Sequence, residues 1–241
     1  MPPIRKGDGT PVTPKGISQI RTGDGRILFD GVAIADSVVA HYDATTESST
    51  GSISTIEDQV GDNDLDGSCT VIDDGIGGEQ AYRFDGTEHM FSNSLVADTE
   101  DIGVILVVQL QNPSSNDHMF DSNEYLNFSL QDDDSGTYEF FRRGSDDSGS
   151  VSGGTIDGDQ NIIESRGHST DGVEVVKNGE TIIDDTNSDG VIDGFYLSSR
   201  GDGDAECEQD ISECFVVDDA SPSDFEQIRS QMANKYGISV E

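Results

Sequence analysis

The stretch Ile211-Ser-Glu-Cys-Phe-Val-Val-Asp-Asp-Ala-Ser-Pro-Ser-Asp-Phe-Glu-Gln-Ile228 decides the fold of this chain, because it joins a strand to the start of a helix. Residues 211–217 are a short, mostly apolar segment bounded by turn residues, which predicts a buried strand. Ser221 is a preferred N-cap residue, Pro222 fits the first helical position, and Asp224 follows three residues after the cap. The stretch therefore predicts a strand that leads directly into a helix.

The predicted helix carries one apolar stripe and ends at a glycine. The stripe consists of Phe225, Ile228, Met232 and Tyr236. This spacing places the four side chains on one face of a helix, where they pack against a core. Gly237 supplies the left-handed residue at which helices commonly stop. We expect this to be the one helix of the chain.

The rest of residues 37–241 indicates short strands between turns rich in Gly, Asp, Ser and Asn. In Tyr125–Leu130, apolar and polar side chains alternate, as in a half-buried strand. The predicted strands are Val38–Tyr42, Tyr82–Phe84, Val104–Leu110, Tyr125–Leu130, Thr137–Phe141, Gly172–Lys177, Glu180–Ile183, Gly194–Ser198 and Ile211–Val217. Many short strands at regular spacing are typical of a sandwich or jelly roll.

One hairpin is predicted with its turn type. Val173–Lys177 and Glu180–Ile183 flank the pair Asn178-Gly179. Asn-Gly supplies the two residues of positive φ that a two-residue type I′ turn needs. We therefore expect these two strands to pair directly.

Several segments resemble concanavalin A-like (laminin-G-like) lectin and glucanase domains. They are the strand and helix of residues 211–238, together with Val39-Ala-His-Tyr-Asp-Ala44, Asp58-Gln-Val-Gly61, Tyr82-Arg-Phe-Asp-Gly86 and Phe195-Tyr-Leu-Ser-Ser-Arg-Gly201. The resemblance spans residues 38–240. It implies an all-β fold, a two-sheet antiparallel jelly-roll sandwich with one C-terminal helix, often with calcium and often binding glycans. Where the family commonly has Trp before Asp-Ala, this chain has Tyr42, and it contains no Trp.

Residues 1–36 differ in amino-acid composition and pattern from the rest of the chain. Four prolines and six glycines interrupt any helix there, and only residues 26–29 indicate a short strand. The segment has too few apolar residues for a core of its own. We therefore expect an extended N-terminal arm over residues 1–36 that anchors the chain or forms a homo-oligomer, followed by a lectin domain over residues 37–241.

The charge of the chain is very large and unevenly placed. The formal net charge is −36 over 241 residues, with a net of +3 over residues 1–26 and −39 over the remainder. Such self-repulsion opposes compaction unless concentrated salt screens it. The acidic, lysine-poor composition resembles that of proteins from extreme halophiles. The alternative, an acidic disordered chain, conflicts with the apolar segments 103–110 and 211–217.

The same charge limits the partners. Duplex nucleic acid needs Lys and Arg to neutralise its phosphates, and an anionic membrane surface has the same requirement. We therefore expect no nucleic acid and no membrane among the partners. Calcium, magnesium or a basic protein surface would be attracted.

The N-terminal sequence and the cysteines bear on the compartment. Met-Pro-Pro-Ile-Arg-Lys at residues 1–6 lacks the apolar region of a signal peptide, so we expect synthesis in the cytoplasm. Cys69, Cys207 and Cys214 form neither a zinc pattern nor an even disulfide set. We expect free thiols, and a Cys207–Cys214 bridge is the alternative.

Two Asp-rich segments have the ligand spacing of calcium loops. Residues 185–193 place Asp185, Asn187, Asp189 and Asp193 at the odd ligand positions, with a turn glycine at Gly190, and residues 62–73 offer Asp62, Asp64, Asp66 and Asp73. No helix flanks either segment, which excludes an EF-hand. We predict Ca²⁺ or Mg²⁺ at these segments, with chance spacing in an Asp-rich chain as the alternative.

The sequence offers little for catalysis. Glu206, Glu208 and Asp210 alternate, as a pair of glycosidase carboxylates on one strand face would, but a solvated acidic edge gives the same pattern. The four histidines are scattered, and no phosphate-binding loop or dinucleotide motif is present. We therefore expect no enzyme activity.

These observations favour a virion structural protein of a haloarchaeal tailed virus, either a head turret or spike or a tail fibre. In this interpretation the chain is made in the host cytoplasm, docks to other virion proteins through its arm, and displays a lectin-like domain for host-surface glycans or glycoprotein. The first alternative is a cell-surface or secreted halophilic carbohydrate-binding module, and the second is a glycoside hydrolase.

Overall fold

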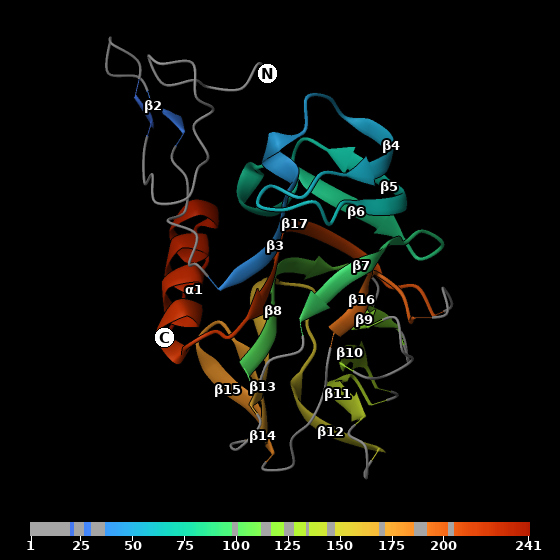
Figure 1. Cartoon of the computed structure of the whole chain (residues 1–241), viewed down its shortest axis with the longest axis vertical. Helices are drawn as coiled ribbons and strands as arrows, with labels where there is room; N and C mark the ends of the chain where they lie inside the picture. The colour runs from blue at the N-terminus through green and yellow to red at the C-terminus, as the bar shows by residue number, and fades with distance from the viewer. Residues whose placement is uncertain are drawn as a thin grey trace. The chain divides into compact units, whose positions relative to one another are not determined.

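The structure is a computed structural model of the whole chain (Figure 1). It describes residues 20–21, 27–29, 37–97, 101–111, 117–122, 128–133, 135–143, 148–168, 172–185, 192–201 and 205–241. The chain divides into two units, Met1–Asp36 and Ser37–Glu241. In the first unit, β1 (Ile20–Arg21) and β2 (Ile27–Phe29) form an antiparallel pair, and β2 confirms the short strand predicted there.

In its described residues, the second unit is an all-β domain with one α-helix, as predicted. Its strands are β3 (Val38–Asp43), β4 (Gly51–Ile56), β5 (Leu65–Ile72), β6 (Ala81–Asp85), β7 (Met90–Ala97), β8 (Asp101–Leu110), β9 (His118–Ser122), β10 (Phe128–Asp132), β11 (Thr137–Arg143), β12 (Ser148–Thr155), β13 (Gln160–His168), β14 (Gly172–Lys177), β15 (Glu180–Asp185), β16 (Ile192–Leu197) and β17 (Glu208–Asp218). Two short 3₁₀ turns, η1 (Ala44–Thr46) and η2 (Ile76–Gly78), lie between them. The strands pair antiparallel throughout, in the order β12-β11-β10-β9-β16-β7-β5-β6-β17-β8-β13-β14-β15.

This path folds into a sandwich whose two ends meet. Strand β12, at one end, packs beside β15, at the other. Gly153 of β12 permits the approach, because a Cβ there would lie 2.2 Å from the carbonyl oxygen of Ile182. Across the middle, a Cβ at Gly167 of β13 would lie 3.2 Å from the ring of Phe128 of β10. Strands far apart in the path therefore face one another across a common core.

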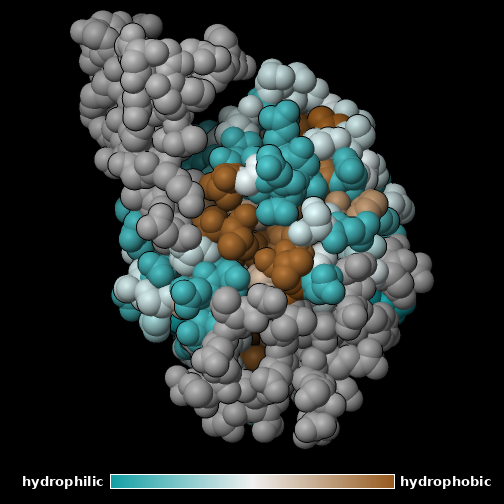
Figure 2. Space-filling model, in the orientation of Figure 1, coloured by the Kyte–Doolittle hydropathy of each residue, from teal (hydrophilic) through white to brown (hydrophobic). Residues whose placement is uncertain are grey.

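The core is apolar and rich in phenylalanine. Phe128 lies 6.0 Å from Phe120 and 4.9 Å from Phe140 between ring centroids, and Phe195 lies 6.1 Å from Phe120. Outside the core, hydrophilic residues cover much of the visible surface of the second unit, and apolar residues gather in a central strip (Figure 2). The core confirms that the acidic chain folds by burying apolar side chains.

The helix α1 (Pro222–Tyr236) begins and ends where the sequence predicts. The backbone N–H of Ser221 donates to the Asp224 carboxylate at 2.9 Å, and Gly237 has φ +69°. All four residues of the predicted apolar stripe are buried. The helix lies against strands β8 and β13, and Gly103 makes room for it, because a Cβ there would lie 2.6 Å from the ring of Phe225.

The predicted hairpin is confirmed, and one strand prediction needs correction. Asn178 and Gly179 both have positive φ between β14 and β15. Strand β10, however, is buried on both faces, because Ser129 donates to the carbonyl oxygen of Phe120 at 3.1 Å and contacts His118 Nδ1 at 2.8 Å. A serine whose hydroxyl group has hydrogen-bond partners can be buried, and the alternation of apolar and polar residues does not show whether such partners exist. The remaining residues of that predicted strand, 125–127, lie outside the described residues.

Candidate functional site

The aromatic cluster is a group of three half-buried rings on the outer face of the sheet. Phe91 of β7 and Tyr196 of β16 are direct cross-strand partners, and their rings stack at 5.5 Å with an interplanar angle of 18°. His89 joins them, with its ring 6.2 Å from Phe91 and 6.0 Å from Tyr196. Because neither large ring is fully buried, the cluster offers an aromatic surface to solvent.

Backbone geometry holds His89 in this place. The N–H of Ser68 donates to the carbonyl oxygen of His89 at 3.0 Å. Gly67 has φ +148°, and a Cβ there would lie 2.2 Å from that same carbonyl oxygen. Only glycine tolerates both the conformation and the close approach. Strand β5 therefore fixes the segment that carries His89.

Two carboxylates flank the aromatic cluster. Asp66 of β5 lies directly opposite Phe91, and its exposed carboxylate accepts a hydrogen bond from Thr55 Oγ1 at 3.2 Å. On the other side, Glu206 Oε1 lies 3.8 Å from His89 Nδ1, and both side chains are about a quarter exposed, 24% and 28%. Rings that stack and carboxylates that accept hydrogen bonds together suit a ligand with one apolar face and many hydroxyl groups.

The segment that carries Glu206 is tied to β9. His118 N–H donates to the carbonyl oxygen of Ala205 at 3.0 Å, and Cys207 N–H donates to that of Ser198 at 3.1 Å. Asp121 of β9 lies opposite Tyr196, but it is fully buried and accepts the N–H of Gly201 at 2.9 Å. Asp121 therefore supports the site without reaching its surface.

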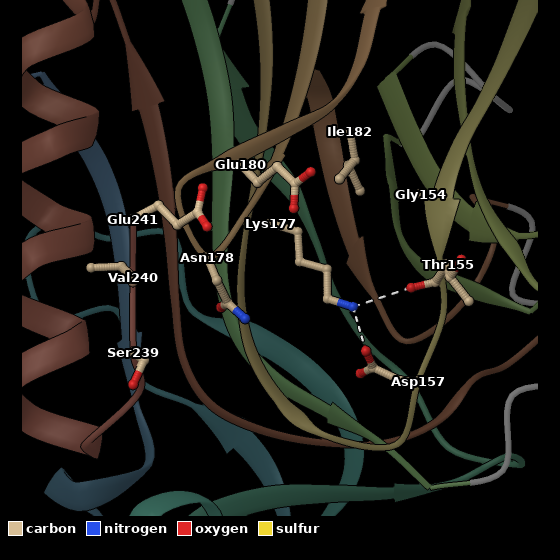
Figure 3. A pocket seen from close by; sticks show the side chains of 10 residues that line it. All are labelled: Gly154, Thr155, Asp157, Lys177, Asn178, Glu180, Ile182, Ser239, Val240 and Glu241. Carbon is tan, nitrogen blue, oxygen red and sulfur yellow. Dashed lines mark hydrogen bonds and ion pairs between the residues drawn. The ribbon is translucent and has the colours of Figure 1, made fainter.

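A cavity of about 600 Å³ lies near the meeting edges of β12 and β15 (Figure 3). It is lined by Gly154, Thr155, Asp157, Lys177, Asn178, Glu180, Ile182, Ser239, Val240 and Glu241. Lys177 Nζ donates to the Thr155 carbonyl oxygen at 3.1 Å and to Asp157 Oδ2 at 2.5 Å, as the dashed lines show. Burial raises the pKa of Asp157, but hydrogen bonds from Lys177 and Asn161 outweigh it and lower that pKa.

The cavity is less suited to a ligand than the aromatic cluster. Its lysine is engaged by the chain itself, and Asn178 is also engaged, through Ile162 N–H at 2.8 Å and Asn161 Oδ1 at 2.7 Å. The cavity lining contains no aromatic ring. We therefore treat it as the second candidate.

A buried polar cluster beneath α1 contains three side chains of the types that bind metal ions. Among the described residues, His41, Asp43 and Glu213 are the three ligand-type side chains that come within 4.8 Å of one another. The ammonium group of Lys235 fills the position of a cation, because its Nζ lies 3.0 Å from both Asp43 Oδ2 and Glu213 Oε2. Tyr236 donates to Glu213 at 2.8 Å. This arrangement is an internal ion-pair cluster.

Of the two predicted cation segments, residues 62–73 are described, and their four aspartates do not lie together as one group of ligands. Residues 65–72 form the extended strand β5, which at about 3.3 Å per residue separates Asp73 from Asp62 and Asp64. Asp64 serves locally, because its carboxylate accepts the backbone N–H of Asp58 at 2.9 Å. Of the other segment, Asn187 and Asp189 lie outside the described residues, so its cation site stays a prediction.

The described lysine and arginine side chains are all engaged by the chain. Arg83 binds Asp210 with two hydrogen bonds of 2.8 and 2.7 Å. Asp210 is 2% exposed, which corrects the expected solvated acidic edge, because a carboxylate held by an arginine can be buried. The other ion pairs are Arg166 with Glu164 and Glu174, Arg229 with Glu164, Lys177 with Asp157, and Lys235 with Asp43 and Glu213. Arg200 also has a partner.

The cysteines are free thiols, as expected, and the alternative Cys207–Cys214 bridge is absent. All three are buried, and burial raises the pKa of each thiol. None of them therefore offers a thiolate at neutral pH. No described helix is long and apolar enough to cross a membrane.

Comparison with solved structures shows a shared β-sandwich fold. The binding domain of Paraclostridial mosquitocidal protein 1 matches with a TM-score of 0.61 and 9% identity, over 83% of this chain and 53% of that one. The botulinum neurotoxin serotype D ligand-binding domain in complex with N-acetylneuraminic acid matches with a TM-score of 0.60 and 11% identity, over 83% and 52%. A Trypanosoma rangeli sialidase in complex with 2,3-difluorosialic acid matches with a TM-score of 0.56 and 11% identity, over 86% and 34%.

This chain spans about half the length of these binding domains, and at such identities the likeness concerns the fold alone. No protein-family model matches the sequence, and no curated protein matches it.

Proposed function

We propose that this chain is a non-enzymatic, lectin-like attachment module that binds host-surface glycans through its aromatic cluster. The observation that carries the proposal is the stacked pair of Phe91 and Tyr196, half-buried on a sheet face between the carboxylates of Asp66 and Glu206. The C–H face of a pyranose stacks on aromatic rings, while its hydroxyl groups donate to carboxylates. Two of the structural neighbours are complexes with sialic acid or its derivative, which supports glycan binding on this kind of fold.

We further propose that the module belongs to a virion structural protein of a haloarchaeal virus, as a head turret or spike or as a tail fibre. The net charge of −39 after residue 26 supports a protein adapted to concentrated salt. The net charge of +3 over residues 1–26 supports docking of the arm on acidic neighbours, either other copies of this chain or other virion proteins. A cell-surface carbohydrate-binding module is the alternative that shares the glycan site but lacks the particle.

The glycan site is tested by binding to a glycan array and to host surface-layer glycoprotein in about 3 M KCl. We expect the double variant Phe91→Ala/Tyr196→Ala to lose binding, because it removes the stacking surface. Val96→Ala is the matched control, since Val96 is an exposed apolar residue of the same strand, 48% exposed, away from the rings. Glu180→Gln tests the cavity of Figure 3. Binding that survives the double variant but not Glu180→Gln would move the site to the cavity.

The arm is tested by deleting residues 1–36 and measuring the molar mass by light scattering in the same buffer. We expect the full chain to form a homo-oligomer and the shortened chain to be monomeric with unchanged glycan binding. An assembly of unchanged size after the deletion would contradict the role of the arm.

The cation prediction is tested by repeating the glycan assay with EDTA. Loss of binding that added Ca²⁺ or Mg²⁺ restores would support a cation site, with the segment 185–193 as the first to substitute. Binding that EDTA leaves unchanged would contradict a cation in glycan recognition. Release of sugar fragments from a polysaccharide in this assay would contradict the non-enzymatic assignment.

A further inference from the structure

We propose that the aromatic cluster selects an uncharged pyranose and rejects sugars that carry a carboxylate. This inference rests on the proposed function and specifies the ligand class of the same site. It sets this chain apart from the structural neighbours whose bound ligands are N-acetylneuraminic acid and 2,3-difluorosialic acid.

The shape of the site favours one sugar face. The rings of Phe91 and Tyr196 stack offset on one another, with centroids 5.5 Å apart and an angle of 18° between their planes, so a sugar can stack only on the ring area that the other ring leaves uncovered. His89 extends this surface at 6.0–6.2 Å from both rings. A sugar that stacks here directs its equatorial substituents sideways, toward whatever borders the rings.

Carboxylates border the rings on both sides. Asp66 is the cross-strand neighbour of Phe91, and directly opposite residues have Cβ atoms about 5 Å apart on the same face. Glu206 lies beside His89, 3.8 Å away. Both carboxylates accept hydrogen bonds from sugar hydroxyl groups, but a sugar carboxylate has no proton to donate at neutral pH and meets a like charge.

Salt does not remove this discrimination. The Debye length is about 3 Å at 1 M salt, so distant charges are screened in a halophile's medium. Groups in direct contact, with no room for an ion between them, still repel. Selection by Asp66 and Glu206 therefore survives at the salt concentration in which the protein works.

The described surface also lacks a spare cation for an anionic sugar. Recognition of a carboxylate commonly uses an arginine or lysine that can turn its donors to the ligand. Among the described side chains, each lysine and arginine is already engaged by the chain itself. For these described side chains, binding a sugar acid would thus require breaking an existing interaction, whereas binding a neutral sugar requires none.

The test compares ligand pairs that differ only in charge. Methyl β-glucoside and methyl β-glucuronide have the same ring configuration, and methyl β-galactoside and methyl β-galacturonide form a second such pair. Saturation-transfer NMR and competition titration on the full chain, in about 3 M KCl, give the ratio of affinities. We expect the neutral member of a binding pair to bind at least about tenfold more tightly, and N-acetylneuraminic acid not to compete. Equal or tighter binding of the uronide would overturn the inference.

A charge variant separates this inference from the proposed function. Asp66→Asn/Glu206→Gln keeps the shape of the site and removes both negative charges. We expect the ratio of the two affinities to fall toward one, because the repulsion of the uronide is removed while both ligands lose the same charged hydrogen-bond acceptors. A preference that stays unchanged in the variant would also overturn the inference. If the unmodified chain binds sugar acids well, the inference fails and the proposed function stands, whereas if no glycan of either class binds, the proposed function itself fails.

Discussion

At the scale of single residues, Lys235 is the side chain whose removal we expect to lower the free energy of unfolding most. Its ammonium group joins two buried carboxylates, Asp43 and Glu213, at 3.0 Å each. The Glu213 side chain is 1% exposed and that of Lys235 29% exposed, so removing the lysine leaves a buried carboxylate without its cation and costs up to about 3–5 kcal/mol, the range for a fully buried pair. We expect Lys235→Met to lower the free energy of unfolding by this order, measured by urea denaturation at fixed KCl.

Lys177→Met is the matched control for that prediction. It also removes a lysine from an ion pair, but its partner Asp157 is 41% exposed, and exposed pairs contribute about 0–1 kcal/mol. An equal loss in the two variants would contradict the special weight of Lys235. Glu213→Gln combined with Lys235→Met should recover part of the loss, because it removes the stranded charge.

The pH dependence of the Lys235 cluster follows from the sign of its pKa shift. Burial lowers the pKa of Lys235, but the charges of Glu213 and Asp43 outweigh burial and raise it. A raised pKa means that the stabilisation is complete below the unfolded-state pKa of about 10.4 and is lost as the pH rises through the folded-state value. The difference in unfolding free energy between the unmodified chain and Lys235→Met should be constant from pH 7 to 9 and shrink above pH 10. A difference that shrinks below pH 7 would contradict this assignment.

At the scale of elements, the docking of α1 depends on a glycine in a strand. A Cβ at Gly103 would lie 2.6 Å from the Phe225 ring and 2.8 Å from the Ser165 carbonyl oxygen. We expect Gly103→Ala to destabilise the fold by about 1–3 kcal/mol, since overpacking displaces the helix from the sheet. Gly158→Ala is the control, because its Cβ would lie at an ordinary contact distance of 3.7 Å from the Leu110 carbonyl oxygen. Similar melting temperatures for the two variants would contradict the tight contact.

Elements with local signals could be predicted from sequence, and elements that depend on distant partners could not. The capped helix and the Asn178-Gly179 hairpin carry their signals within a few residues. The sequence did not predict strand β13, because its polar residues Glu164 and Arg166 are buried. Each of them forms ion pairs that compensate its charge. Strands β4 and β12 were not predicted, because glycine and small polar residues make up most of each.

The candidate site was missed for the same reason. Phe91 and Tyr196 are over a hundred positions apart in the sequence, and only the register of β7 with β16 brings them together. A signal existed in the aromatic residues near the start of β7 and near the end of β16, but it did not indicate that the two share a face. Conversely, the calcium spacing of residues 62–73 was visible in sequence, and strand β5 extends it. Ligand spacing along the sequence predicts a set of metal ligands only where the backbone forms a compact loop that brings those residues together.

At the scale of the whole molecule, the distribution of charge separates two kinds of ionic contribution. Arg166, Arg229 and Lys235 form ion pairs inside or at the edge of the sandwich, where salt screens them weakly. The excess carboxylates of the net charge of −36 have no such partners to balance them and repel one another. Lowering KCl from about 3 M to 0.1 M lengthens the Debye length to about 10 Å and restores that repulsion. We therefore expect the free energy of unfolding to fall by at least about 2 kcal/mol, measured by thermal or urea unfolding, while the loss caused by Lys235→Met stays the same at both concentrations.

Sucrose at equal osmolality is the control, because it favours burial without screening charge. If sucrose replaces KCl without loss of stability, the repulsion argument fails. If the Lys235→Met loss grows at low salt, the cluster beneath α1 is more accessible to solvent ions than its burial indicates.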